Sequence, residues 1–467
     1  MPDKRLLFLC LRFRPDEFAQ ISQFLRAPPA RSALEALAEF LRVFLKLGFT
    51  PELRGVPSSE FVLAIEGVRD PRPPSVEDTI VLALEPLELR QAAELQEKIE
   101  LAQQEGRLPE AHVSVDLPIA PTDVWCPQEA SFPLFGQRDL ALAQINAASA
   151  AAKGAFGDDV NVVIVDQGIN FPVLQSRFPG VNFVGGWIVD KYGRGGPPGP
   201  PTPMNPGTWP DGHGTKMAET VLSVAPHANI LDLPLLPSHI VGLQGYLAWA
   251  AGIYWSFLGV IPWLRRFPPY QGPWVLCNAW AVYDLRDDPP PPSPLNYGQN
   301  PGNPLNSAVT SLPSLGLADV AFAAGNCGQF CPDARCGVGQ IGPGRSIYGV
   351  AAINNVLSVS AVRCDEIWLG YSSQGPTPPN FASVKPDLCA PSQFAGPADW
   401  GRAYTGTSTA CALATGAMAA ARSFAETQTL SPAALRVRAI ARASVPVSET
   451  VPNHRIGSGL IDIDALL

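Results

Sequence analysis

Three residues with side chains suited to nucleophilic catalysis lie far apart in the chain. Asp166 follows an apolar run, His213 stands between two glycines, and Ser408 follows Gly-Thr and precedes a run of small residues. A serine hydroxyl is a weak nucleophile until a base removes its proton, and imidazole is the most common such base. A carboxylate can orient that imidazole and stabilise its charged form. If folding brings the three together, they could perform acyl transfer.

The stretch 405–420, TGTSTACALATGAMAA, surrounds Ser408 and has the composition of a closely packed helix. A serine at the start of such a helix faces unpaired backbone N–H groups and the positive end of the helix dipole. That environment would stabilise an oxyanion formed by attack of the serine. The alternative is structural, because serine is also a favoured N-cap residue.

Short apolar runs predict the strands that would position these residues. The run 160–165, VNVVIV, is typical of a parallel strand buried on both faces, and it ends at Asp166. Acidic residues at the carboxyl ends of such strands often belong to sites, although Asp-Gln-Gly also suits a turn. Further strands are predicted at 274–278, 319–324 and 357–362, and a helix from His213 to about Ser223. This alternation indicates an α/β fold of three layers, a mostly parallel sheet with helices on both faces.

Four local motifs together resemble those of the subtilisin-like serine proteases. They are VVIVDQGI around Asp166, DGHGT around His213, AFAAGN ending at Asn326 and TGTSTA around Ser408. Their order along the chain is the Asp, His, Ser order of subtilisin. The likeness extends from about Ile145 to the C-terminus, where GSGLIDID resembles the closing strand of that family. The resemblance implies a subtilisin-like fold and a serine endopeptidase that acts on polypeptides.

The same resemblance implies a role for each site residue. Ser408 would attack the scissile carbonyl, His213 would act as base and then acid, and Asp166 would orient the imidazole. Asn326 and the backbone N–H of Ser408 would form the oxyanion hole. The substrate would bind as an added strand. The expected walls of its pocket are Ala279, Trp280, Ala281, Ala323, Ala324 and Gly325.

Two residues depart from the family pattern. Gln167 stands where the family usually has serine or threonine after the aspartate, and Ala412 stands where it usually has proline. Neither replaces a reacting atom, so we expect activity. The departures keep a second hypothesis open, in which the chain is a non-catalytic module with this fold that holds a peptide in its cleft.

Residues 1–106 have the pattern of a separate small α+β domain. Strands are predicted at 5–13, 60–68 and 78–84, and helices at 32–47 and 86–104. No cluster of catalytic residue types occurs there. Family resemblance suggests a propeptide-like, inhibitory or regulatory unit, or one that binds an activating partner. Residues 107–144 are irregular in pattern and predict a linker, which leaves 145–467 as the catalytic domain.

Composition excludes some classes of partner and favours a compartment. The 467 residues carry a net charge of −9 without a basic cluster, which argues against a nucleic-acid partner. The N-terminus lacks the pattern of a secretory signal, so we expect a cytoplasmic protein. The uncharged stretch 240–264 is long enough to cross a membrane. Its glycines and its position between two motifs favour a buried helix and the loop beside it, so no membrane association is expected.

Three of the nine cysteines, Cys327, Cys331 and Cys336, lie just after Asn326. They could be free thiols, form one disulfide or bind a metal. Free thiols are favoured in a reducing compartment, and a fourth metal ligand is not evident nearby. No cofactor is required by the predicted chemistry. Calcium is suggested by the family alone, because no convincing acidic loop is seen.

Overall fold

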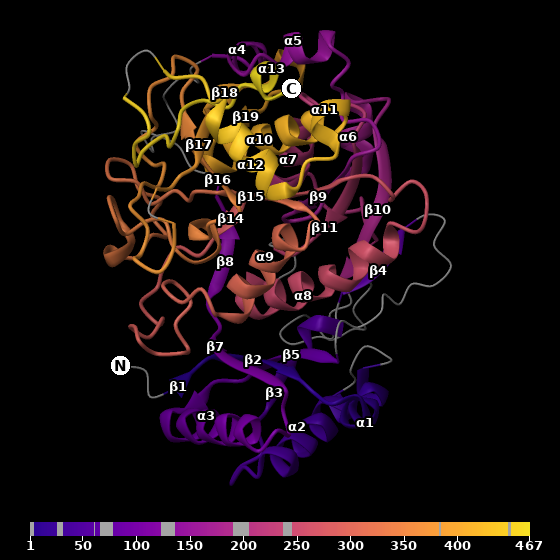
Figure 1. Ribbon diagram of the computed structural model, residues 1–467, viewed down its shortest axis with the longest axis vertical. Helices are drawn as coiled ribbons and strands as arrows, with labels where there is room; N and C mark the ends of the chain where they lie inside the picture. Colours follow the sequence, from indigo (N-terminus) through magenta and orange to yellow (C-terminus); the bar gives the residue numbers. More distant parts are fainter. Residues whose placement is uncertain are drawn as a thin grey trace.

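The computed structural model describes residues 4–25, 31–59, 61–65, 78–122, 136–189, 205–236, 245–382, 384–446 and 450–467. Its centre is an eight-stranded sheet in the order β17-β16-β15-β13-β9-β11-β10-β4 (Figure 1). All neighbouring pairs are parallel except β10 with β4. The strands are β17 (Leu388–Pro391), β16 (Leu357–Val362), β15 (Asp319–Ala323), β13 (Trp274–Asn278), β9 (Asn161–Val165), β11 (Asn229–Leu233), β10 (Asn182–Val189) and β4 (Phe61–Ile65).

Strand β9 lies in the middle of this sheet and is buried along its whole length. Val163 pairs with Leu231 of β11 on one side and with Leu276 of β13 on the other. Helices cover both faces, so both sets of side chains need apolar surroundings. The near-continuous apolar run seen in the sequence follows from this double burial. The predicted α/β architecture is confirmed.

Two hydrophobic cores fill the space between the sheet and its helices. On one face, α7 (His213–Leu222) and α10 (Gly406–Arg422) pack together and against β13, β15 and β16. On the other face lie α8 (Leu247–Leu264) and α9 (Pro304–Ser314). Ala and Gly residues along α10 let it pass close to α7; a side chain at Gly416 would collide with Val221 and Val224. The small-residue run therefore reflects close helix packing.

Helix α8 makes up the apolar stretch 240–264 from Leu247 onward, after β12 (Gly245–Tyr246), and residues 240–244 lie outside the described residues. Within the described chain it is the one helix long and apolar enough to span a membrane. Most of it is buried, because one side packs on α9 and another on the N-terminal domain. A buried helix at this position was predicted, and the packing accounts for its composition.

The N-terminal domain is a four-stranded antiparallel sheet, in the order β3-β5-β2-β7, covered by helices on the side away from the central sheet (Figure 1). A core separate from the two others lies between these layers. The elements are β2 (Leu7–Arg12), α1 (Pro15–Leu25), α2 (Arg31–Leu45), β3 (Leu53–Gly55), β5 (Thr79–Leu84), α3 (Leu89–Gln104) and β7 (Glu110–Val115). The predicted α+β character of this unit is present.

Two segments contradict the expected division into domain and linker. Strand β4 was assigned to the N-terminal domain, but it pairs with β10 at the edge of the central sheet. Residues 107–122, expected to be linker, contain β7 and then β8 (Pro118–Pro121). Both are paired by long-range contacts, which an irregular local pattern does not reveal. The ordered N-terminal unit therefore extends to residue 122, and α4 (Arg138–Gln144) occupies the end of the expected linker.

The remaining elements are short and lie around the sheet. They are β1 (Lys4–Arg5), η1 (Pro57–Ser59), β6 (Leu87–Glu88), α5 (Ala147–Ala152), α6 (Phe171–Arg177), β12 (Gly245–Tyr246), β14 (Trp280–Ala281), η2 (Val338–Gln340), η3 (Gly349–Ala352), β18 (Phe394–Ala395), η4 (Ala398–Trp400), β19 (Ala403–Tyr404), α11 (Ala425–Gln428), α12 (Pro432–Ala441) and α13 (Ile463–Leu466).

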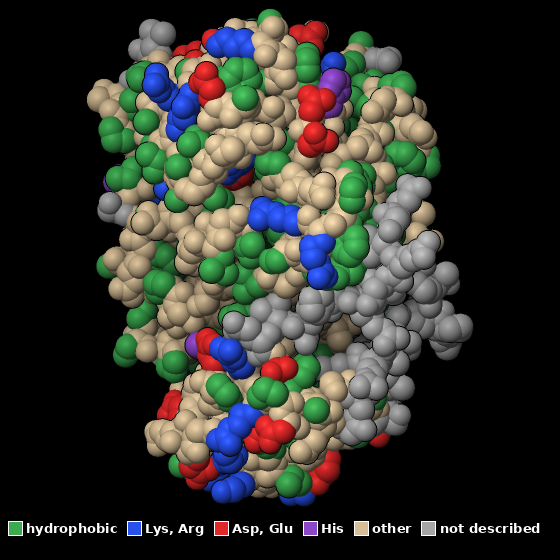
Figure 2. Space-filling view, turned by 45° about the vertical axis from the view of Figure 1, so that its right-hand side comes forward, with side chains coloured by type: hydrophobic (Ala, Val, Ile, Leu, Met, Phe, Trp, Pro, Cys, Tyr) green, Lys and Arg blue, Asp and Glu red, His purple; other side chains and the backbone are tan. Residues whose placement is uncertain are grey.

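On the face shown in Figure 2, acidic and basic side chains are intermixed over the N-terminal domain.

Candidate active site

Asp166 and His213 form a buried pair at the carboxyl edge of the central sheet. Asp166 follows β9, and His213 is the first residue of α7. Nδ1 of His213 lies 2.7 and 2.9 Å from the two carboxylate oxygens of Asp166. Both side chains are buried, at 6% and 0% exposed. The carboxylate therefore fixes the orientation of the imidazole.

Two glycines let the backbones carrying this pair approach each other. A Cβ on Gly214 would stand 2.5 Å from the carbonyl oxygen of Gly168. Gly168 itself has a positive φ of +96° and lies against the ring of Trp209. A larger residue at either position would push α7 away from the end of β9. Close packing between the end of β9 and the start of α7 thus accounts for the glycines near Asp166 and His213.

Ser408 is the third residue of α10, whose N-cap position is taken by Thr405. The alternative interpretation of Ser408 as an N-cap serine is therefore wrong. Its hydroxyl is buried and lies 2.5 Å from Oγ1 of Thr122 and 3.3 Å from the carbonyl oxygen of Ala279. It remains in the first turn of a 17-residue helix, where the helix dipole favours negative charge.

Asn326 follows β15. The oxygen of its side-chain amide is hydrogen-bonded, whereas the nitrogen has no partner among the described residues. Its Oδ1 accepts hydrogen bonds from the backbone N–H of Thr407, at 3.0 Å, and from the Thr407 hydroxyl, at 2.9 Å. These bonds fix which way the amide points. Its Nδ2 is buried and has no hydrogen-bond partner in the described part of the chain. A buried unpaired donor is costly, so its retention indicates a function.

The sheet brings these residues to one edge. Strands β9, β13 and β15 are parallel neighbours, and they are followed by Asp166, Ala279 and Asn326 respectively. Ser408 touches Ala279, and its neighbour Thr407 is bonded to Asn326. The four residues that the sequence places in separate motifs are therefore brought together by the strand order.

The two departures from the family pattern are accommodated. At Gln167 the backbone N–H donates to Oδ1 of Asp166, at 2.7 Å, and any residue other than proline could supply this bond. Ala412 is fully buried within α10, which runs unbroken from Gly406 to Arg422. Neither position disturbs the placement of Asp166, His213 or Ser408.

A segment of the N-terminal unit lies in the cleft beside Ser408, and this was not predicted. Strand β8 runs between β12 and β14 and pairs antiparallel with both; Figure 1 shows β8 next to β14. Ala281 pairs with Ala120, and the N–H of Thr122 donates to the carbonyl of Ala279, at 3.0 Å. The predicted substrate wall 279–281 therefore already binds an extended peptide, whose last described residue touches Ser408.

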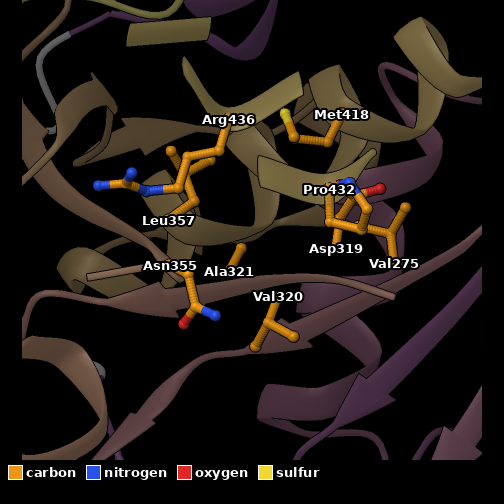
Figure 3. Close-up of a pocket in the computed structure, with 9 residues that line it drawn as sticks. All are labelled: Val275, Asp319, Val320, Ala321, Asn355, Leu357, Met418, Pro432 and Arg436. Carbon is orange, nitrogen blue, oxygen red and sulfur yellow. The ribbon is translucent and has the colours of Figure 1, made fainter. Parts of the chain in front are cut away.

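A small cavity lies between the two predicted pocket walls. It has a volume of about 20 Å³ and is lined on one side by Trp280 and Ala281 and on the other by Ala324 and Gly325. Two of the six predicted wall residues, Ala279 and Ala323, are buried in the opposite core and do not line this cavity. A cavity of about 10 Å³ at the amino-terminal ends of the strands, near Asp319, is remote from these residues (Figure 3).

A second buried acid, Asp232, lies on β11 beside β9. Its Oδ2 accepts a hydrogen bond from the N–H of Gly207, at 2.9 Å, while Oδ1 has no hydrogen-bond partner among the described residues. Burial raises the pKa of Asp232 to about 7, and the nearby charge of Asp166 adds to the increase. Sequence reasoning missed this residue, since a lone Asp within an apolar run carries no local signal.

The cysteine cluster contains a disulfide between Cys327 and Cys336, and Cys331 is disulfide-bonded as well, so the favoured prediction of free thiols is wrong for all three. Disulfides persist mainly in oxidising compartments, and the cytoplasmic location expected from the sequence remains a prediction. Within the described ranges, no group of three or more His, Cys, Asp or Glu side chains could hold a metal ion. Calcium, suggested by resemblance alone, remains a prediction.

Solved structures provide a comparison for the fold. Fervidolysin from Fervidobacterium pennivorans, a keratinolytic enzyme related to subtilisin, is 16% identical with a TM-score of 0.54, and the match covers 100% of this chain and 62% of fervidolysin. MycP1 from Mycobacterium smegmatis is 18% identical with a TM-score of 0.48, over 76% of this chain and 90% of MycP1. At these identities the similarity concerns the fold.

Sequence comparison identifies the family. No curated protein matches the chain. The model of the subtilase family matches residues 157–459, which is well over half of the chain and includes Asp166, His213, Asn326 and Ser408. The buried Asp–His pair, the serine in the first turn of α10 and the parallel sheet that joins them therefore belong to a member of the subtilase family of serine peptidases.

Proposed function

We propose that the chain is an endopeptidase in which Ser408, His213 and Asp166 act as a catalytic triad. The observation that carries this proposal is the buried contact of His213 Nδ1 with Asp166, at 2.7 and 2.9 Å. It leaves Nε2 as the ring nitrogen that takes a proton from Ser408. The carboxylate also stabilises the imidazolium that results.

The reaction balances with water as its one further reagent. Ser408 Oγ bonds to the scissile carbonyl carbon as its proton passes to His213. His213 then gives that proton to the departing amine, the C–N bond breaks, and an ester with Ser408 remains. A water molecule attacks the ester in the same way, with His213 as base, and releases the acid and the free serine.

The negative oxygen formed at each step would be stabilised by two donors. One is the Asn326 Nδ2, which is buried, held in orientation through Thr407, and lacks a partner among the described residues. The other is the backbone N–H of Ser408 in the first turn of α10. Donors already in place need no reorganisation during the reaction, which is why such sites lower the barrier.

A fluorophosphonate probe tests the proposal, because it reacts with serines activated in this way. We expect one label per chain on Ser408, none on Ser408→Ala, and normal labelling of Ser423→Ala, a control at the other end of α10. Labelling of Ser408→Ala would contradict the assignment. Failure of the wild type to label, with peptides bound but not cleaved, would favour a non-catalytic peptide-binding module.

We further propose that residues 118–122 inhibit the site by occupying it. Three observations support this proposal. Strand β8 pairs with both cleft strands, Thr122 contacts Ser408 at 2.5 Å, and Ile119 is almost fully buried. The domain carrying this segment is also held by five paired residues of β4 on β10. Substrate would have to displace β8, while β4 keeps the inhibitor close by.

Opening of the cleft can be tested in the full chain. Ile119→Asp places a charge in the buried position of β8 and should raise the rate of fluorophosphonate labelling at least about 10-fold. Leu89→Asp, at an exposed position of the same domain, is the matched control and should leave the rate unchanged. Equal rates for Ile119→Asp and wild type would contradict inhibition. Intact-mass analysis would show whether a fragment ending at Thr122 is released.

A further inference from the structure

The cavity beside Ser408 is closed by two buried tyrosine rings. We propose that Tyr297 and Tyr348 restrict the enzyme to substrates with a small side chain, such as Ala, Ser or Thr, directly before the cleaved bond. This inference rests on the proposed endopeptidase function and defines its substrate class. Neither tyrosine was singled out in the sequence, because each lies in a loop or at the start of η3, far from the triad motifs.

The bound segment lies beside the walls of this cavity. Thr122 is held by its N–H on the carbonyl of Ala279 and touches Ser408. Trp280, the next residue after Ala279, lines the cavity, and so does Asn326 on the facing side. The Thr122 hydroxyl turns to the carbonyl of Ala279 and to Ser408 and does not line the cavity. We infer that a longer side chain bound at this place would extend into the cavity, because Trp280 and Asn326 form its walls.

Tyr348 is held across the cavity. Its hydroxyl donates to the carbonyl oxygen of Val282, at 2.8 Å, and Val282 lies on the wall that begins at Trp280. The ring thus links η3 to that wall and is only 8% exposed. Removing it from the cavity would break a buried hydrogen bond, so the ring cannot swing aside at little cost.

Tyr297 closes the remaining side and is braced from behind. Its hydroxyl accepts from the N–H of Val350, at 3.3 Å, and its ring packs on Gly349, where a Cβ would come within 2.2 Å of the ring. The carboxylate of Asp288 accepts from the N–H groups of Tyr297 and Gly298, at 2.7 and 2.8 Å. Fixed at both ends, this ring is a rigid wall.

The space left is of the size of one small group. A cavity of about 20 Å³ holds about one water-sized probe. A methyl or hydroxyl group fits such a space, whereas a phenyl ring would require both tyrosines to move.

Peptidyl phosphonate probes that carry Ile-Ala-Pro, the sequence 119–121, before a variable last residue test the inference on the full-length chain. Labelling is followed by intact mass at probe concentrations where the rate is proportional to concentration, so that opening of the cleft affects all probes equally. We expect the Ala analogue to react at least about 10-fold faster than Leu and about 100-fold faster than Phe. A Phe analogue as fast as Ala would overturn the inference.

Variants assign the effect to the tyrosines. Tyr348→Ala should lower the Ala-to-Phe rate ratio at least about 10-fold, while Tyr348→Phe keeps the ring and should keep the ratio. Val350→Ala, a milder change in the same cavity, should lower the Ala-to-Leu ratio about threefold and serves if Tyr348→Ala does not fold. Folded variants with the wild-type ratios would contradict the role of these walls.

A probe without a peptide portion separates this inference from the proposed function. If the simple fluorophosphonate fails to label Ser408 both in the wild type and in Ile119→Asp, the variant expected to open the cleft, the endopeptidase function itself is wrong. If it labels Ser408 while the Phe and Ala analogues react equally fast, the enzyme function stands and the small-residue specificity is wrong.

Discussion

Two buried acidic residues lie at opposite ends of the strands of the central sheet, and their surroundings differ. Asp319 begins β15 and binds Arg422 through both carboxylate oxygens, at 2.6 and 2.8 Å. Nη1 of Arg422 is bonded to backbone carbonyls of the segment 427–430. At the other end of the strands Asp166 holds His213, but Asn326 Nδ2 and one oxygen of Asp232 lack hydrogen-bond partners among the described residues.

This difference in hydrogen bonding distinguishes the structural pair of Asp319 and Arg422 from the pair of Asp166 and His213, which we propose to be catalytic. A buried ion pair is retained when its remaining polar atoms are bonded, as they are around Arg422. A site that must stabilise charge during a reaction needs hydrogen-bond donors that are unpaired before the reaction. Such unpaired donors lower the stability of the resting protein. The small cavity in Figure 3 lies at the end of the strands near Asp319, and among its lining residues the buried Oδ1 of Asn355 lacks a hydrogen-bond partner in the described part of the chain.

The same substitution at the two aspartates should therefore have opposite consequences, and the larger is expected at Asp166. In Asp166→Asn the amide favours the wrong imidazole tautomer, so kcat/KM for a peptide substrate should fall about 10⁴-fold. The free energy of unfolding in urea should change by less than about 1 kcal/mol. A loss of activity under 10-fold would contradict the pairing of Asp166 with a catalytic His213.

Asp319→Asn should affect stability instead. It leaves the Arg422 guanidinium buried without a counter-charge, so the free energy of unfolding should fall by about 3–5 kcal/mol. Replacing both partners, as Asp319→Leu with Arg422→Met, should restore most of that loss. Fluorophosphonate labelling per folded molecule should be unchanged in both variants. A large drop in fluorophosphonate labelling of the folded protein would show that the pair of Asp319 and Arg422 also contributes to the proposed active site.

Asn326→Asp tests the unpaired donor. The aspartate keeps an oxygen for Thr407 but replaces Nδ2 with a second acceptor. We expect kcat to fall about 10²–10³-fold, a magnitude known for the corresponding donor in subtilisin, a member of the family. KM should change little, because the donor acts on the oxyanion. Activity within about threefold of wild type would exclude Asn326 from the oxyanion hole.

Asp232→Asn should give the smallest effect, on the pH dependence of stability. The raised pKa means that the folded chain holds a proton that the unfolded chain loses near pH 4. The free energy of unfolding should therefore fall as pH rises from about 4 to 7, by at most about 1.4 kcal/mol per unit. Asp232→Asn keeps the hydrogen bond from the N–H of Gly207 but carries no titrating carboxyl. Its free energy of unfolding should therefore lack this decrease with pH. Unchanged slopes in urea titrations would contradict the raised pKa.

The local sequence was sufficient for the residues whose conformation is decided by near neighbours. Strand β9 was predicted within one residue because burial on both faces leaves a continuous apolar run. His213 and Ser408 were found because the tight packing at each helix start requires glycines and small residues beside them. Their order in the chain matches one family, and the family then supplied Asn326, whose unpaired amide a local pattern does not show.

What the sequence alone determined, then, was the fold class and the identity of the four residues at the carboxyl edge. Only the tertiary structure decided what fills the cleft, where β4 belongs and how small the pocket is. Strand β8 and Tyr348 owe their roles to contacts with residues more than 60 positions away. Such contacts depend on the packing of the whole chain, and no periodicity or short motif records them.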